Sequence, residues 1–297
     1  MIDATNIEPD PHRSITPELP SFPATYNLGP NRVIIPGSPP KWLPQDLPIS
    51  LPPDTPAIDP RLILPACPFD AMLRAVSIIS PSLEMDSFDL LTDRKNLRAL
   101  LNFVNGVKQS YRIDAELIRG TLLFYLGYDE VCLEASEPGW NALDHHITTP
   151  FTTPTGLSIF QSGILVSPDN VVEIKTAREQ AHSTIVPRTL AQLWFSQTPI
   201  LITGYHDGNG RFSSMRKTNM LESGLLKKWE VKNTTSLQKV VRLIEMIKDH
   251  LVCSPIKQQA IVLESGKMGS TVKFYSLNGY HQVGLPDDLR QMWPTQA

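Results

Sequence analysis

Glu173 and Lys175 are the residues whose types and spacing most directly suggest chemistry, and a single isoleucine separates them. Side-chain direction on a β-strand repeats every two residues, so a strand here presents the carboxylate and the ammonium on one face. A carboxylate can ligate a divalent metal, and a nearby ammonium can orient a water or stabilise phosphoryl charge. The spacing therefore indicates a metal or phosphate site, with a surface ion pair as the alternative.

The elements that would position this pair follow from the apolar periodicity of the chain. Apolar residues recur at helical spacing in three segments, and Asp93 or Thr92 can cap the first. Helices are expected over residues 90–104, 190–197 and 237–251. Alternating or continuous apolar stretches between turn residues predict strands. Strands are expected at residues 111–117, 120–124, 156–166, 171–176, 200–205, 260–264 and 271–276.

The N-terminal region differs from the rest in composition, because sixteen of the 27 prolines lie in residues 1–65. Proline fixes φ and lacks an amide donor, so it continues neither a helix nor a central strand. We therefore expect an extended proline-rich arm over residues 1–65, either partly disordered or wrapped around the domain. A single folded domain is expected over residues 66–297.

The overall composition excludes several classes of protein. Lysine and arginine number 27 and aspartate and glutamate 30, giving a net charge of −3 rather than the basic balance of a dedicated nucleic-acid binder. Three widely spaced cysteines form neither a disulfide framework nor a zinc pattern. No apolar stretch is long enough to span a membrane, and no secretory signal is evident. An intracellular protein, cytoplasmic or nuclear, is expected.

Several segments in order resemble the decapping-exonuclease family, a branch of the PD-(D/E)xK nuclease fold, and its divergent fungal relatives in particular. The segments are Ser87–Leu97 (SFDLLTDRKNL), Tyr111–Asp114 (YRID), Gly120–Leu122 (GTL), Val172–Thr176 (VEIKT), Leu193–Gln197 (LWFSQ) and Ile202–Gly208 (ITGYHDG). The resemblance implies an α+β or α/β fold in which helices flank a central mixed sheet. It also implies action on RNAs with defective 5′ ends, with Mg²⁺ or Mn²⁺.

The residues of this sequence that match the family's active site are Arg94, Glu173, Lys175 and Gln197. Two other parts of the pattern are missing. Gly163 and Leu165 stand where the resemblance implies a Glu-x-Asp pair, and the stretch around Trp140 lacks the glutamate of an earlier motif. Glu173 is then the one matching metal ligand, and a single carboxylate binds Mg²⁺ weakly. Lys175 is expected to pair with Glu173 and neutralise the site.

Three functions from different classes remain open. The first is a cofactor-independent enzyme acting on a small molecule, such as a cyclase of fungal specialised metabolism. Its pocket would be lined by Trp140, Gly163, Leu165, Trp194 and Tyr205. The second is a residual decapping nuclease or pyrophosphohydrolase that uses Mg²⁺ or Mn²⁺, with further ligands such as Asp144 or Asp169. The third is a non-catalytic relative that binds RNA or a protein.

Overall fold

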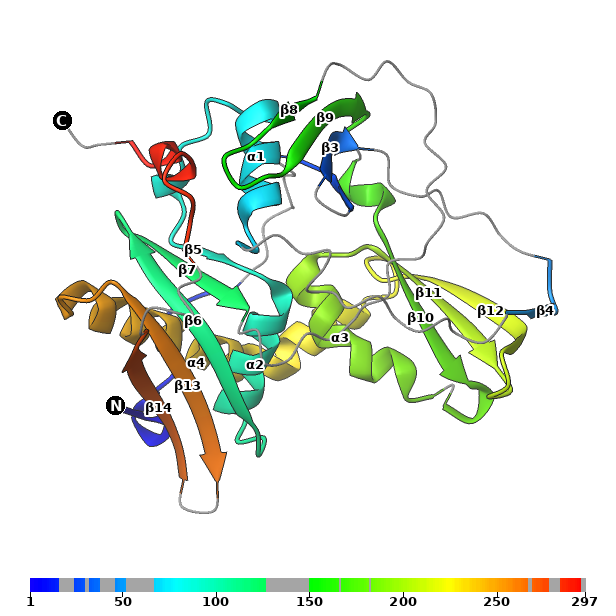
Figure 1. Ribbon diagram of the computed structural model, residues 1–297. Coiled ribbons are helices and arrows are strands. Elements are labelled where there is room, and N and C mark those ends of the chain that lie inside the picture. Colours follow the sequence, from blue (N-terminus) through cyan, green and yellow to red (C-terminus); the bar gives the residue numbers. More distant parts are fainter. Residues whose placement is uncertain are drawn as a thin grey trace.

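A computed structural model of the 297-residue chain describes residues 1–15, 24–29, 32–37, 46–51, 67–126, 150–165, 167–181, 183–266, 269–277 and 284–294 (Figure 1). The described residues form four α-helices and three hydrogen-bonded sheets. The α+β class predicted from the sequence is confirmed, and the strands divide among three sheets rather than forming one. No helix among these residues is both long and apolar enough to cross a bilayer.

The largest sheet has six strands in the order β1-β14-β13-β6-β7-β5. Antiparallel pairing runs through most of it, and β5 joins β7 in parallel. The strands are β1 (Ile2–Asp3), β5 (Leu90–Thr92), β6 (Ser110–Ile118), β7 (Thr121–Leu126), β13 (Gln258–Gly266) and β14 (Gly269–Ser276). The predicted strands at 111–117, 120–124, 260–264 and 271–276 are thus confirmed.

Two four-stranded sheets complete the fold. The first, called the Glu173 sheet here, has the order β10-β11-β12-β4, with β10 (Val172–Arg178), β11 (Ile200–His206), β12 (Arg211–Asn219) and β4 (Ile49–Ser50). The second, called the small sheet, has the order β2-β3-β9-β8, with β2 (Asn27–Gly29), β3 (Arg32–Gly37), β9 (Ser158–Gly163) and β8 (Phe151–Thr152).

Four helices pack between and over these sheets: α1 (Asp70–Ile79), α2 (Arg94–Val104), α3 (Ile185–Ser196) and α4 (Leu225–Cys253). In Figure 1, α2 and α3 lie between the largest sheet and the Glu173 sheet, while α1 lies beside the small sheet. Short 3₁₀ turns occupy Ala4–Asn6, Met85–Ser87, Pro168–Asn170, Glu179–Ala181 and Leu289–Met292. The predicted helix at 90–104 is confirmed but begins later, at Arg94. It begins there because the Asp93 carboxylate caps it, accepting a hydrogen bond from the Asn96 backbone amide at 2.8 Å.

The main core joins α2, α3 and α4 to the inner strands. Leu100, Leu193, Leu201, Leu243 and Ile261 are all fully buried within it. Burial of apolar side chains at this scale supplies most of the stability of such a domain. The core therefore holds α2, α3 and β11 in fixed relation, and these elements surround the strand that carries Glu173.

The described parts of the proline-rich region contribute one strand each to the largest sheet and the Glu173 sheet, and two strands to the small sheet. Ile2 pairs with Val272 in the largest sheet, and Phe212 pairs with Ile49 in the Glu173 sheet. In the small sheet, residues 32–37 run parallel to residues 158–163. The described residues of the arm are thus tied into the fold by backbone hydrogen bonds. The division into an arm at 1–65 and a domain at 66–297 stays a prediction.

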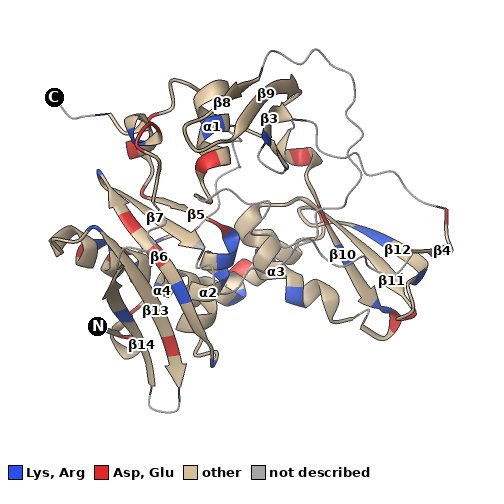
Figure 2. Cartoon of the chain, viewed as in Figure 1, with Lys and Arg blue, Asp and Glu red and all other residues tan. Residues whose placement is uncertain are grey.

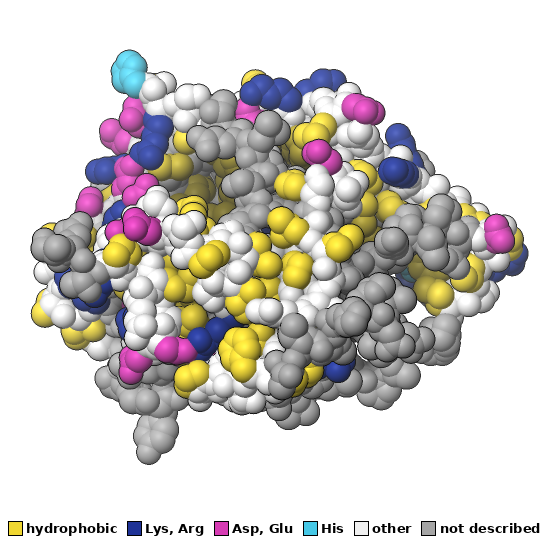
Figure 3. Space-filling view, turned by 90° about the horizontal axis from the view of Figure 1, so that it is seen from above, with side chains coloured by type: hydrophobic (Ala, Val, Ile, Leu, Met, Phe, Trp, Pro, Cys, Tyr) yellow, Lys and Arg dark blue, Asp and Glu magenta, His cyan; other side chains and the backbone are white. Residues whose placement is uncertain are grey.

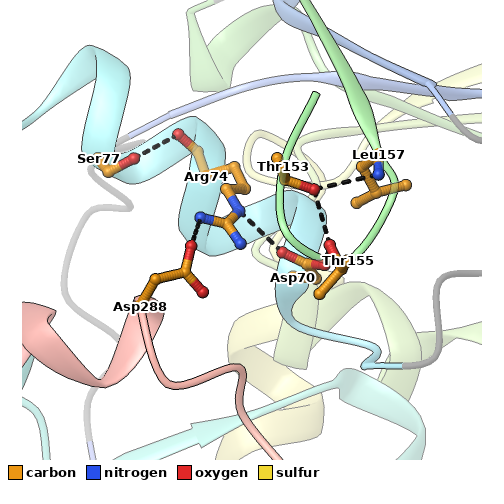
Figure 4. A network of polar contacts seen from close by, with 7 residues as sticks. All are labelled: Asp70, Arg74, Ser77, Thr153, Thr155, Leu157 and Asp288. Carbon is orange, nitrogen blue, oxygen red and sulfur yellow. Dashed lines mark hydrogen bonds and ion pairs between the residues drawn. The ribbon is translucent and has the colours of Figure 1, made fainter. Parts of the chain in front are cut away.

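Helix α1, which the sequence analysis did not predict, is fastened by a buried polar network (Figure 4). The carboxylate of Asp70 accepts hydrogen bonds from Arg74 Nε at 3.0 Å and from Thr155 Oγ1 at 2.5 Å. Arg74 also pairs with Asp288 near the end of the described chain. The network therefore connects α1 to the turn between β8 and β9 and to the last 3₁₀ turn.

Candidate functional site

Glu173 is the centre of a cluster of charged and polar side chains from three elements. Its Oε2 accepts a hydrogen bond from Arg94 Nη1 at 2.9 Å. Its Oε1 lies 2.8 Å from Lys175 Nζ and accepts a hydrogen bond from Gln192 Nε2 at 2.7 Å. Both carboxylate oxygens are therefore engaged by nitrogen donors. The structure thus brings together Arg94, Glu173 and Lys175, as the motifs of the sequence imply.

Local structure explains how these side chains meet. Glu173 and Lys175 project from the same face of β10, because they are two residues apart. Arg94 is the first residue of α2, directly after the Asp93 cap. Gln192 lies in α3, and the next residue of this helix, Leu193, is buried in the main core. Rigid secondary-structure elements thus hold all four groups, and none of them depends on a loop.

The environment of Glu173 favours its ionised form. Burial acts to raise the pKa of this carboxyl group, but the hydrogen bond from Lys175 and the charge of Arg94 outweigh it. The pKa of Glu173 is therefore lower than its ordinary value, and the group is an anion at neutral pH. With Arg94 and Lys175 both cationic, the three ionised groups sum to one net positive charge.

The donor set does not fit a resident Mg²⁺ or Mn²⁺ among the described residues. Such ions need several oxygen ligands, whereas Glu173 is surrounded by nitrogen donors, two of them cationic. Nowhere in the described part of the chain do three or more histidine, cysteine, aspartate or glutamate side chains form a group that could hold a metal ion. Asp169 is exposed in a 3₁₀ turn, and Asp144 lies outside the described residues.

Comparison with known proteins places the chain in a family. The sequence model of a family described as "Domain of unknown function (DUF8563)" matches residues 21–129 and 164–293. The chain belongs to the DUF8563 family. The two matched segments of this DUF8563 chain include Arg94, Glu173, Lys175 and Gln192. A search of curated proteins returns no match.

Solved structures similar to the DUF8563 chain carry the names Rai1 and Dxo1. Scheffersomyces stipitis Rai1, in complex with (3′-NADP)⁺ and calcium ion, is 12% identical with a TM-score of 0.48, covering 76% of this chain and 80% of that one. Candida albicans Rai1, in complex with pU5-Mn²⁺, is 11% identical with a TM-score of 0.47, covering 76% and 80%. K. lactis Dxo1, in complex with manganese, is 9% identical with a TM-score of 0.42, covering 69% and 70%. Likeness at this level establishes neither an activity nor a ligand for the DUF8563 chain.

The glutamine of the cluster differs from the one that the sequence analysis selected. Gln197 ends α3 in a left-handed conformation, with φ 50°, and its side chain donates to the carbonyl oxygen of Trp194. Gln192, five residues earlier, supplies the contact with Glu173. The glutamine in contact with Glu173 is thus Gln192, and a role for Gln197 in the site stays a prediction.

The four described residues among those predicted to line a pocket, Gly163, Leu165, Trp194 and Tyr205, are not brought together. Gly163 is the last residue of β9, and Leu165 lies two residues after it. Strand β9 pairs with β3 and β8 of the small sheet, not with β10. Leu165 is 50% exposed, whereas Trp194 and Tyr205 are buried. Trp140 lies outside the described residues of the DUF8563 chain.

Trp194 and Gly163 lie in different environments. Trp194 donates its indole hydrogen to Glu230 at 3.1 Å and packs against Trp229. Gly163 borders a 280 Å³ cavity whose other walls are Ile35, Pro36, Ile78, Ile79, Gln161 and Ser162. The residues of the Glu173 cluster do not line this cavity. The described residues of the DUF8563 chain therefore hold two separate candidate sites, one charged and one with both polar and apolar walls.

Proposed function

We propose that this protein recognises the phosphorylated 5′ end of an RNA at the Glu173 cluster. The observation that carries the proposal is the placement of two cations, Arg94 and Lys175, around one partly buried carboxylate. The net positive charge of the cluster suits a phosphate group. Arginine and lysine are also the side chains that bind phosphate most strongly, through charge-assisted hydrogen bonds.

The position of Arg94 supports a role in ligand binding. A cation in the first turn of a helix opposes the helix dipole, at a cost of about 0.3–1 kcal/mol. Helix α2 has both Arg94 and Lys95 there and no acidic residue in that turn. The Asp93 carboxylate already caps the amino-terminal end of α2 and offsets the positive potential of the helix. An arriving anion would therefore be attracted by the side chains of Arg94 and Lys175.

A second row of basic residues favours an RNA over an isolated phosphate. Strand pairing aligns Lys175 with Thr203 and Thr203 with Arg216, so Lys175 and Arg216 project from the same face of the Glu173 sheet. Two strand spacings separate them by about 10 Å. Arg216 is exposed, and Arg188 lies one helical turn before Gln192. Figure 2 shows lysine and arginine at the start of α2 and along β10 and β12.

The proposal is tested by fluorescence anisotropy with two RNAs of one sequence, ending in a 5′-phosphate or a 5′-hydroxyl. We expect the phosphorylated RNA to bind about tenfold more tightly. Arg94→Met should abolish this preference, and Arg216→Met should weaken binding of both RNAs. Arg242→Met, which removes an exposed arginine of α4, is the matched control and should change neither. Equal affinity of the wild type for the two RNAs would contradict the proposal.

A competition experiment separates an RNA end from a nucleotide as the ligand. A nucleoside 5′-monophosphate presents the same phosphate without the phosphates that would reach Arg216. If RNA is the ligand, the nucleotide competes weakly and its affinity does not change in Arg216→Met. A nucleotide that competes as well as the RNA would instead assign the site to a small phosphorylated molecule.

The cavity beside Gly163 favours a second candidate, an enzyme that acts on a small molecule without a cofactor. Its walls combine the apolar side chains of Ile35, Ile78 and Ile79 with the polar groups of Gln161 and Ser162. Figure 3, which views the molecule from above Figure 1, shows hydrophobic side chains spread over the middle of this face. Ile164, beside the cavity in sequence, is 69% exposed. Ile79→Trp would fill the cavity, so unchanged turnover of a candidate substrate in this variant would exclude this site.

A further inference from the structure

Glu173 is engaged on both sides by groups that a divalent ion would have to displace. Arg94 Nη1 is 2.9 Å from one carboxylate oxygen, and Lys175 Nζ and Gln192 Nε2 are 2.8 Å and 2.7 Å from the other. An ion entering between them would lose the charge-assisted hydrogen bonds of the cluster. It would also meet two like charges at short range, in a site screened only in part by water.

The same two cations can do electrostatically what a divalent ion does for a phosphate. A metal ion at a phosphate site contributes two positive charges beside the phosphoryl oxygens. Arg94 and Lys175 together carry two positive charges, and Glu173 fixes their positions. The side chains of Arg94 and Lys175 are 30% and 25% exposed, so both reach solvent from which a ligand can approach.

We infer that Arg94 and Lys175, held in place by Glu173 and Gln192, bind a phosphate group directly, without a divalent metal ion. This inference rests on the proposed function for its ligand, a 5′-phosphorylated RNA, and adds that protein cations replace the ion. Glu173 and Gln192 then act as positioning residues. Arg94 and Lys175 are the groups that contact the phosphate.

The inference is tested by measuring the affinity of 5′-phosphorylated RNA twice, with EDTA present and with Mn²⁺ added. We expect the two dissociation constants to agree within about twofold, because no ion takes part. Lys175→Met should weaken binding about tenfold in EDTA, since it removes one charged donor. Binding that appears in Mn²⁺ and is absent in EDTA would overturn the inference and leave the proposed function standing.

A matched control separates the role of Lys175 from a general effect of charge. Lys273 pairs with Glu264 between neighbouring strands of the largest sheet, Nζ to Oε2 at 2.6 Å, so Lys273→Met makes the same substitution at another lysine–glutamate pair. This variant should bind like the wild type. Equal weakening in Lys175→Met and Lys273→Met would overturn the inference, because it would show that net charge alone governs affinity.

A second probe distinguishes failure of the inference from failure of the proposed function. Inorganic pyrophosphate presents the anion without the RNA, and calorimetry in EDTA measures its binding directly. Pyrophosphate binding that Lys175→Met weakens, together with no binding of RNA, would support the inference and refute the RNA ligand. No binding of pyrophosphate or of RNA in EDTA would overturn the inference.

Discussion

The ion network around α1 gives a quantitative prediction about stability. The side chain of Asp70 is fully buried, that of Arg74 is 11% exposed and that of Asp288 is 34% exposed (Figure 4). Replacing Arg74 by methionine keeps most of the apolar stem but removes the cation. The buried Asp70 carboxylate is then left with the hydroxyl of Thr155 as its described side-chain donor. Breaking a buried ion pair on one side costs about 3–5 kcal/mol.

The magnitude should depend strongly on which partner is removed. Asp288→Asn removes a carboxylate that is about one-third exposed, and such a pair contributes about 1 kcal/mol or less. Asp70→Asn combined with Arg74→Met removes both members of the buried pair. The double variant should therefore recover about 2 kcal/mol relative to Arg74→Met, because no uncompensated buried charge remains.

Urea denaturation followed by circular dichroism measures these differences, and parallel slopes would show that the unfolded state is unchanged. From highest to lowest, the predicted order of the free energies of unfolding is wild type, Asp288→Asn, the double variant and then Arg74→Met. If Arg74→Met loses no more stability than Asp288→Asn, the assignment of Arg74 as the compensating charge of a buried carboxylate is wrong.

Three further predictions concern other parts of the molecule. The hydrogen bond from Arg74 lowers the pKa of Asp288, so the stabilisation by this carboxylate should be complete at neutral pH and should fade as the pH falls below about 4. Acid titration of wild type and Asp288→Asn measures this, and a difference in stability that does not shrink below that pH would contradict it. Gln192→Leu should weaken RNA binding roughly fivefold, as measured by fluorescence anisotropy, whereas Gln197→Leu should leave it unchanged. The reverse result would refute the proposal that Gln192 positions Glu173. Gly163→Ala should lower the free energy of unfolding by about 3 kcal/mol, because φ is +99° and a Cβ would lie 2.0 Å from a backbone oxygen. Gly156→Ala, at φ +83° in open space, should lower it by about 1 kcal/mol. Equal losses of the two variants in thermal unfolding would argue against the close contact at Gly163.

Local sequence patterns predicted the elements that carry the site. The Asp93 cap, the apolar spacing of α2 and the two-residue period of Glu173 and Lys175 each depend on neighbouring residues. Such patterns report the conformation of a short segment directly. Helix α2, strand β10 and the shared face of the glutamate and the lysine were therefore accessible from the sequence.

Long-range pairing was not accessible in the same way. β9 precedes β10 in the chain, yet it pairs with a strand from the proline-rich region and belongs to another sheet. Nothing in the local pattern of residues 158–163 states which strand they will pair with. Gln197 was selected for its place in a motif, but the left-handed end of α3 directs its side chain back to Trp194.

Protein cations occupy the space around Glu173 that a metal ion would need. Calorimetric titration of Mn²⁺ into the wild type and into Glu173→Ala tests this arrangement. We expect the two proteins to give the same heats, with no Mn²⁺ binding that is lost when Glu173 is replaced. Micromolar binding to the wild type that disappears in Glu173→Ala would contradict it.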